Sequence, residues 1–572
     1  MLQNTKFLNF EKFLSFLIIF SFSYSVFYNL IFFDLSVSPD YEYYISYIET
    51  FFNIKENTDL DQGLIYHFFI ALVLTISENS INGPNIQIYI SNSIHLVNNL
   101  LFLIGLIGVN QLLKFYKTKA IDRKLIVLAT IFIPFITQAR FHYKPEIFAI
   151  AFIPWILLNY FTYQKTKDIK HIFISITLFV GTGFLKGNIF VMLGLLLFFL
   201  ILNDLKKVSL QHIAMGIVYF FAITIPLVLE NQRFNGSSLF RNTKKRLDSE
   251  VYENVISIDF FTNFSFYKFI RKPNFDPENV NFFSTVLIDT FNDFFGVSWN
   301  IDHFPMSREY YIFENWILNG LFNYAEYYLS FVLSILFYLY IIYSIIKKRD
   351  RVEVIIYLAP FIGLSVLLIN SLGFPFKNFD PSKGDTFKSI YFSFLLFISF
   401  IYISKNIFLK LKMLYKVLFV FFLISFNIFS LGINTEIFEN DRFVEQRSLI
   451  LQHTPLCKVG NILDFNIFDV DCNPPSDSCG KPGIPDNYTK KLINQDGTIK
   501  FFEDEDGFGE IYLLNKDIKD SRLVKGFDEC YHFQELGYTH PFRLEFIIFP
   551  VYNLFIFLIM IFSIFISYRI NK

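Results

Sequence analysis

The chain has 572 residues, of which 53% are hydrophobic and 20% aromatic, and its mean hydropathy is +0.41. Only 18% of the residues are charged, below the roughly 25% of soluble domains, which excludes a soluble globular protein and an intrinsically disordered one. The formal net charge of −1 gives no reason to expect a nucleic-acid partner. This composition predicts a polytopic membrane protein, and membrane lipids are therefore expected partners.

Apolar stretches of near-spanning length, without Lys, Arg, Asp or Glu in their interiors, recur along the chain. A helix needs about 20 apolar residues to cross the hydrocarbon, so the shorter stretches must use their polar flanks or a thinned bilayer. The first stretch has no small-residue cleavage signal behind it, which favours an uncleaved anchor. We predict an all-α fold of about twelve transmembrane helices at 13–33, 89–113, 125–138, 146–163, 172–185, 187–203, 211–229, 327–346, 353–369, 389–404, 415–433 and 546–568.

Residues 63–77 form a further apolar segment that decides the topology. The segment is short for a crossing but long enough for a helix in the membrane interface. If it does not cross, every basic loop falls on one side, which the positive-inside rule makes cytoplasmic. If it crossed, the basic loop at 114–124 and all later ones would lie outside. We therefore predict that 63–77 lies flat on the outer surface and that both termini are cytoplasmic.

This topology predicts three parts. Residues 1–433 form a transmembrane core with external loops at 34–88 and 230–326. Residues 434–545 form a small external domain, α/β or β-rich, because strand-like runs alternate there with Pro and Asp-Gly turn signals. Residues 546–572 return as a C-terminal transmembrane helix with a cytoplasmic tail.

All four cysteines of the chain lie in the external 434–545 segment. Such clustering suits disulfides in an oxidising compartment, with three possible pairings, while a zinc site is the alternative. No Cys-x-x-Cys pair supports zinc, and the acidic run before Gly507 lacks EF-hand spacing. We assign no metal site and leave a divalent-metal requirement open. The disulfide candidates are Cys457, Cys472, Cys479 and Cys530.

Carboxylates follow closely on the outer end of the first span. Asp40 and Glu42 come just after a Ser-Pro turn, and Asp59 and Asp61 precede the flat segment. A carboxylate beneath a low-dielectric lid at the membrane surface can have its pKa raised toward that of a useful general base. The alternative is an ordinary polar interfacial loop.

Several external motifs occur in a characteristic order. They are Ser38-Pro39-Asp40-Tyr41, the flat segment with Leu64-Ile65-Tyr66-His67-Phe68-Phe69, a second span after Gly83, the turn Arg140-Phe141-His142-Tyr143-Lys144-Pro145-Glu146, the hairpin Gly183-Phe184-Leu185-Lys186-Gly187, and Lys383-Gly384-Asp385-Thr386-Phe387-Lys388. In this order the chain resembles the GT-C superfamily of integral-membrane glycosyltransferases, of the protein mannosyltransferase and aminoarabinose transferase type.

The resemblance implies inverting transfer of a sugar from a polyprenyl-phosphate donor to a lipid-linked glycan or lipid acceptor. It places the reaction on the non-cytoplasmic face, in a periplasm or an endoplasmic reticulum lumen. The family's acidic residue, the general base, maps onto Asp40, and Glu42 is the second candidate for that role. The family's Pro-Pro-Leu entry to the flat helix is replaced here by residues 61–64, Asp-Gln-Gly-Leu, which leaves the sugar and acceptor open.

The donor phosphate requires cations at the outer interface. External basic residues near span ends oppose the inside-positive trend, and snorkelling to lipid headgroups is their alternative role. These candidates are Arg140, Lys144, Lys186, Lys383 and Lys388.

Three more residues are candidates for the acceptor side or the loops around it. His142 lies between two of the cations, and Glu146 ends the same turn. Asp289 lies in a second membrane-lying helix predicted within 282–295, where it either faces an acceptor groove or only anchors the loop.

Two other classes stay open. A transporter or flippase for lipid-linked saccharides would place ionisable residues and broken helices near the midplane, whereas the span interiors here lack such residues. A non-catalytic membrane assembly protein is the third class.

Overall fold

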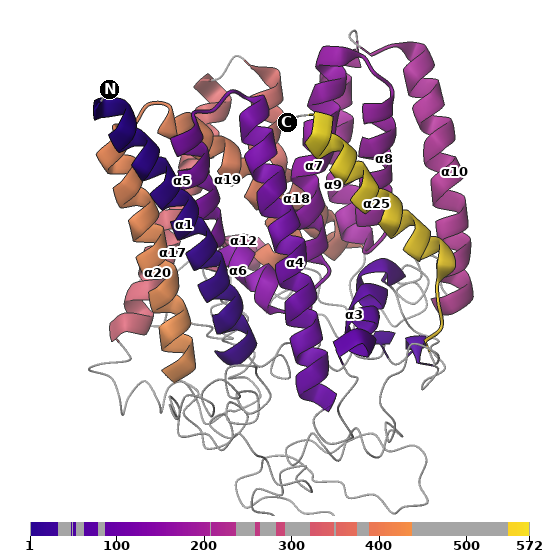
Figure 1. The fold of residues 1–572 in the computed structure, drawn as a ribbon, viewed down its shortest axis with the longest axis horizontal. Helices are drawn as coiled ribbons and strands as arrows, with labels where there is room; N and C mark the ends of the chain where they lie inside the picture. The colour runs from indigo at the N-terminus through magenta and orange to yellow at the C-terminus, as the bar shows by residue number, and fades with distance from the viewer. Residues whose placement is uncertain are drawn as a thin grey trace, which may run out of the picture.

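A computed structural model describes residues 2–32, 47–48, 50–52, 62–77, 86–205, 208–235, 258–262, 282–291, 321–347, 350–373, 388–436 and 547–570. All regular elements in these ranges are helices (Figure 1), in agreement with the all-α prediction. Eight helices among these residues are long and apolar enough to cross a membrane. The protein is thus an α-helical multi-pass membrane protein.

The eight long apolar helices are α1 (Leu2–Phe32), α4 (Ile86–Phe115), α7 (Glu146–Thr166), α10 (Leu210–Asn235), α17 (Leu321–Lys347), α18 (Arg351–Gly373), α19 (Ser393–Phe408) with the preceding 3-10 turn η6 (Ser389–Phe392), and α25 (Val551–Ile570). The other helices described are α3 (Leu64–Ser77), α5 (Ala120–Ile131), α6 (Pro134–Phe141), α8 (Lys170–Gly183), α9 (Gly187–Asn203), α12 (Ile258–Thr262), α14 (Phe282–Asp289) and α20 (Met413–Glu436).

The stretch predicted as one span at 125–138 forms two helices instead. Helix α5 ends at Ile131 and α6 begins at Pro134. Proline has no N–H to donate to the preceding turn, and its ring disfavours helical geometry at the residue before it. The break lies inside the bundle, and α6 then carries Arg140 in its last turn.

Helix α7 is the centre of the bundle. Its residues from Glu146 to Tyr163 are all buried, and it packs against α4, α8 and α19. Glycines on α4 permit the close approach, because a Cβ at Gly108 would lie 2.7 Å from the Trp155 indole nitrogen. That indole donates to the Ile104 carbonyl oxygen at 3.0 Å. Because α7 is buried among these helices, their packing fixes the positions of both its ends.

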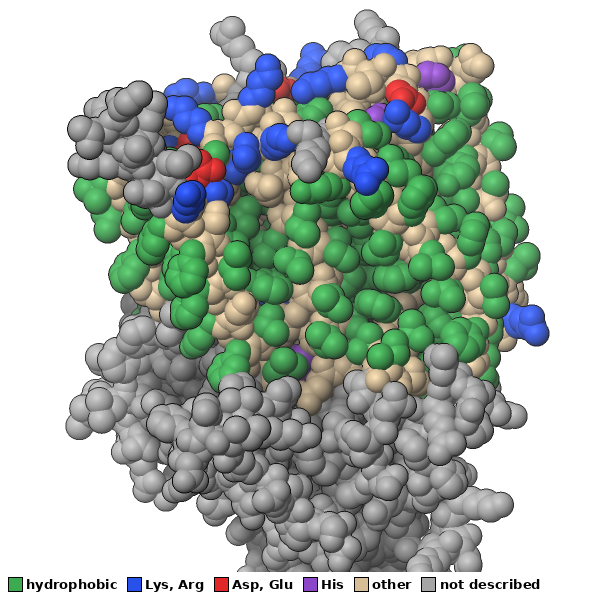
Figure 2. All heavy atoms as spheres, viewed as in Figure 1, with side chains coloured by type: hydrophobic (Ala, Val, Ile, Leu, Met, Phe, Trp, Pro, Cys, Tyr) green, Lys and Arg blue, Asp and Glu red, His purple; other side chains and the backbone are tan. Residues whose placement is uncertain are grey.

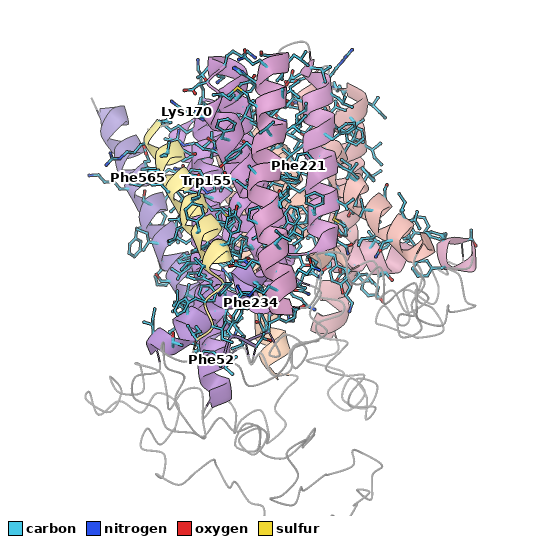
Figure 3. The ribbon with its side chains drawn as sticks, turned by 90° about the vertical axis from the view of Figure 1, so that its right-hand side faces the viewer. Phe52, Trp155, Lys170, Phe221, Phe234 and Phe565 are labelled. Atoms are coloured by element: carbon cyan, nitrogen blue, oxygen red, sulfur yellow. The ribbon has the colours of Figure 1, made fainter. Side chains whose placement is uncertain are left out.

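Lys and Arg side chains gather along one end of the bundle, at the upper edge of Figure 2, and we call this the basic end. Lys170 marks this end in Figure 3, whereas Phe52 marks the opposite end, which we call the site end. Ion pairs tie helix ends together at the basic end: Lys416 Nζ lies 2.6 Å from Asp122 Oδ1. Most of the exposed basic residues that the structure describes therefore lie at one end, as expected from the positive-inside rule.

Helix α3 lies at the site end, beside the lower ends of α4 and α25 in Figure 1. It has 14 residues and is not among the eight helices of spanning length. Leu64, His67 and Ile70 are fully buried, so α3 is packed into the bundle and does not merely rest on its surface. Its entry is fixed by the Gly63 N–H, which donates to the Leu185 carbonyl oxygen at 2.8 Å.

Candidate functional site

The turn between α6 and α7 brings four predicted site residues together at the site end. Arg140, His142, Lys144 and Glu146 are all buried, with at most 5% of each residue exposed. Asn98 of α4 holds the turn, since its amide nitrogen donates to the carbonyl oxygens of Arg140 at 2.9 Å and His142 at 3.0 Å. Snorkelling to headgroups, the alternative role for such cations, would leave their charged tips exposed.

Arg140 is a buried cation with little around it to balance its charge. Its Nη2 donates to the Ser25 hydroxyl of α1, and its guanidinium lies 5.0 Å and 4.9 Å from the ring centres of Phe102 and Phe141. Nε and Nη1 have no hydrogen-bond partner, and Arg140 has no ion pair within the described part of the chain. Arginine stays protonated in proteins, and an unpaired buried charge costs several kcal/mol. The guanidinium is therefore a place where an anion would be strongly favoured.

Lys186 pairs with Glu146, so two predicted site residues neutralise each other. Lys186 Nζ lies 2.7 Å from Glu146 Oε1 and 4.5 Å from the centre of the Tyr391 ring. The Glu146 side chain is 1% exposed and its Oε2 has no hydrogen-bond partner, while the Lys186 side chain is 17% exposed. The pair fixes the α8–α9 hairpin against the start of α7, and Arg140 remains the stronger candidate for binding an anion.

His67 of α3 contacts the same turn from the other side. Its Nδ1 lies 2.8 Å from the Tyr143 hydroxyl, its Nε2 lies 3.4 Å from Gln62 Oε1, and its ring stacks on Tyr47 with 4.1 Å between centres. Burial lowers the pKa of His67 to about 3, so the imidazole is neutral. From the sequence, His67, Tyr143 and Gln62 lie within external motifs, but no role was predicted for any of them.

Gly63 fixes the entry to α3 by a close backbone contact. A Cβ at this position would collide with the backbone carbonyl oxygen of Phe184. The backbone of residues 62–64 therefore lies directly against the α8–α9 hairpin, where only glycine fits.

Asp289 contacts Ser389, the residue after Lys388, at another part of the site end. Lys388 is 8% exposed and precedes η6. The Asp289 carboxylate accepts the Ser389 N–H, and the Asp289 carbonyl oxygen accepts the Ser389 hydroxyl at 2.7 Å. Asp289 ends α14, which is shorter than the helix predicted within 282–295. These bonds are those of an anchor that holds η6 in place.

Several predicted residues lie outside the described residues. They are the candidate bases Asp40 and Glu42, the cation Lys383, and the cysteines Cys457, Cys472, Cys479 and Cys530. The predicted domain at 434–545 also lies outside them, apart from the end of α20.

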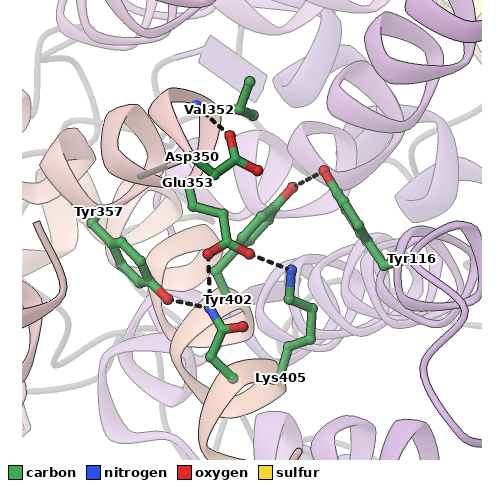
Figure 4. Close-up of polar contacts among 8 residues, drawn as sticks. Tyr116, Asp350, Val352, Glu353, Tyr357, Tyr402 and Lys405 are labelled. Atoms are coloured by element: carbon green, nitrogen blue, oxygen red, sulfur yellow. Dashed lines mark hydrogen bonds and ion pairs between the residues drawn. The ribbon is translucent and has the colours of Figure 1, made fainter. Parts of the chain in front are cut away.

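A second polar cluster lies at the basic end and was not predicted (Figure 4). Lys405 Nζ pairs with Glu353 Oε1 at 2.9 Å and sits 4.2 Å from the centre of the Tyr116 ring. Tyr402 donates to the Tyr116 hydroxyl at 2.6 Å, and Asn406 donates to Glu353 Oε2 at 3.3 Å. In the sequence Lys405 resembles one more loop charge, and only the packing of α18 against α19 gives it a carboxylate.

No known protein family, curated protein or solved structure matches this chain. Fold and site define the class: a multi-pass α-helical membrane protein with buried cations where α6 meets α7.

Proposed function

We propose that the protein is a GT-C-like membrane glycosyltransferase. It transfers a sugar, with inversion, from a polyprenyl-phosphate donor to a lipid-linked glycan or lipid acceptor. The observation that supports this most is Arg140, a buried cation with two unpartnered nitrogens at the end opposite the basic loops. An anionic lipid headgroup that enters from the outer leaflet supplies the charge that this residue lacks.

The proposal includes a topology of about twelve crossings. Beyond the eight long helices, the broken pair α5–α6 and the helices α8, α9 and α20 also cross. The basic end is cytoplasmic by the positive-inside rule, so the site end and the 434–545 domain face the non-cytoplasmic side. Helix α3 does not cross and closes the site end.

The reaction follows from the residues proposed to surround it. Asp40, or Glu42 in reserve, accepts the proton of the acceptor hydroxyl as its oxygen attacks the anomeric carbon. The bond between that carbon and the phosphate oxygen breaks, and polyprenyl phosphate leaves with one more negative charge. Arg140 donates hydrogen bonds to the departing phosphate, and Lys144 adds positive charge nearby. Lys186 acts through Glu146 and holds the hairpin.

The test is transfer by the full-length protein in lipid nanodiscs, supplied with a panel of polyprenyl-phosphate sugars. Release of polyprenyl phosphate that depends on acceptor is the readout. We expect Asp40→Asn to lower transfer by about 10²–10⁴-fold, the usual contribution of a general base, with donor binding retained.

Glu42→Gln, Asp59→Asn and Asp61→Asn are the matched controls. Loss of transfer in Glu42→Gln, with Asp40→Asn active, moves the base by two residues and leaves the enzyme class intact. Full activity in all four variants, or no transfer by the wild type with any donor, ends the glycosyltransferase proposal in favour of a flippase or an assembly protein.

A further inference from the structure

Helix α1 carries a stripe of polar side chains into the bundle. Ser21, Ser25 and Asn29 are spaced by four residues, and each is at most 5% exposed. Asn29 is fully buried, and neither its amide nitrogen nor its amide oxygen has a hydrogen-bond partner. Buried amides are nearly always bonded, so this one calls for an explanation.

The unpartnered Asn29 amide is joined to Arg140 through Ser25, and two of the three guanidinium nitrogens of Arg140 have no partner. Ser25 accepts from Arg140, and Asn29 is one helical turn further along the same face, about 6 Å between Cβ atoms. Since α1 runs from the basic end toward the site end in Figure 1, Asn29 is on the site-end side of Ser25. The unsatisfied polar atoms of α1 are thus one helical turn from the serine that Arg140 of α6 contacts.

The chemistry of these atoms specifies what would satisfy them. Nε and Nη1 of Arg140 are donors only and require acceptor oxygens, best from an anion. Asn29 offers a donor and an acceptor, so its carbonyl oxygen requires an N–H or O–H from the ligand. An anion without an O–H group, such as sulfate, satisfies the guanidinium but leaves that carbonyl oxygen without a donor.

We propose that Ser25, Asn29 and Arg140 form a buried subsite for a phosphate group that has a hydroxyl beside it. The phosphate oxygens accept from Arg140 and from the Asn29 amide nitrogen, and the neighbouring hydroxyl donates to Asn29 Oδ1. A sugar linked through its anomeric oxygen to phosphate presents this pair of groups. The identity of the ligand as the sugar donor rests on the proposed function, whereas the subsite itself does not require that transfer occurs.

Membrane lipids with glycerol headgroups carry the same combination of phosphate and hydroxyl. A binding experiment separates the two sources. Full-length protein in nanodiscs of zwitterionic lipid is titrated with a labelled polyprenyl-phosphate hexose. Competitors are polyprenyl phosphate, polyprenol, inorganic phosphate and phosphatidylglycerol.

We expect polyprenol and inorganic phosphate to compete poorly and the wild type to prefer the sugar-bearing donor over phosphatidylglycerol. Arg140→Met weakens binding of the donor and of polyprenyl phosphate by about 100-fold or more, the range for a lost charge-assisted contact. Asn29→Leu weakens donor binding by about tenfold and polyprenyl phosphate binding by less, because only the donor carries the hydroxyl.

Ser404→Ala is the matched control, since Ser404 is another buried hydroxyl without a partner, on α19 at the basic end. It should leave donor affinity within about twofold of the wild type. Folding is checked by thermal unfolding without ligand. Asn29→Leu should melt no lower than the wild type, because leucine has the same branched shape and removes an unsatisfied buried amide.

Wild-type affinity in Asn29→Leu, or equal binding of polyprenol and polyprenyl phosphate, overturns the subsite. Equal competition by phosphatidylglycerol overturns its assignment to the sugar donor. Binding that follows the expected pattern without any transfer leaves the subsite in place and counts against the glycosyltransferase proposal. Transfer with an unchanged donor KM in Asn29→Leu counts against the subsite and leaves the glycosyltransferase proposal in place.

Discussion

Lys186 and Glu146 form an ion pair of 2.7 Å that joins the α8–α9 hairpin to the first residue of α7. The carboxylate is the buried partner, and its second oxygen has no hydrogen bond. The pair therefore removes one cation from the set available to a phosphate.

Replacing Lys186 by Met should destabilise the protein by about 3–5 kcal/mol, because an unpaired carboxylate would remain buried. The double variant Glu146→Gln with Lys186→Met should recover most of that loss, since no charge is then left. Thermal unfolding in detergent micelles measures both. Equal destabilisation in the single and double variants would show that lost packing, not the unpaired charge, is responsible.

The C-terminal helix should depend on a single carboxylate of α10. Glu230 accepts the N–H of Tyr552 at 2.8 Å through Oε1 and the N–H of Asn553 at 2.6 Å through Oε2, so it caps the first turn of α25. We expect Glu230→Ala to cost about 1–2 kcal/mol and Glu230→Gln to cost less. Protease protection of α25 and thermal unfolding provide the measurements.

Glu11→Gln is the control for that experiment. Glu11 pairs with Lys124 at 2.9 Å, but its side chain is 37% exposed, and such pairs contribute little. A loss from Glu11→Gln as large as that from Glu230→Ala would contradict the capping role.

Acid should destabilise the protein through His67. Its folded pKa of about 3 lies below the unfolded value of 6.5, so between these values the unfolded chain binds the extra proton. Stability from neutral His67 is therefore complete above 6.5 and declines as the pH falls through this window, by at most about 1.4 kcal/mol per pH unit. The melting temperature of His67→Gln should fall less steeply with acid than that of the wild type, and parallel curves would refute this.

Topology can be measured by cysteine labelling from either side of sealed vesicles. Thr118 of the basic end is buried, whereas Lys119 beside it is exposed and suits a reporter. A second reporter at Lys500 probes the predicted external domain. With the four native cysteines replaced by serine, the two reporters should react from opposite sides, and reaction of both from one side would disprove the topology.

The native cysteines should be oxidised in protein from its own membrane. All four lie in the segment that the topology makes external, where disulfides persist. Non-reducing mass spectrometry should find two linked pairs among Cys457, Cys472, Cys479 and Cys530. Four free thiols would be evidence against an oxidising compartment.

Helix positions were predictable because a spanning helix is specified locally, by a run of apolar residues. The predicted span at 187–203 coincides with α9, and that at 146–163 begins with α7. The break at Pro134 was missed because the apolar run continues through it, and hydropathy does not register the lost backbone hydrogen bond.

For the site end, the sequence predicted only which types of residue lie near the ends of the spans. The sequence by itself determined that Arg140, Lys144 and Glu146 share one turn, because neighbours in a short turn must be close. It did not reveal that Lys186 pairs with Glu146, or that Ser25 contacts Arg140. Those pairs are 40 and 115 residues apart in the chain.

The membrane class, the sorting of basic loops and most helix positions thus follow from the order of residues alone, because each is decided by the transfer of a local segment from water to lipid. Which charge is neutralised and which stays unpaired was decided by tertiary packing. Partners such as Ser25 for Arg140 and Glu353 for Lys405 come from different helices. Their contact depends on how those helices pack against each other, so no local sequence pattern predicts it.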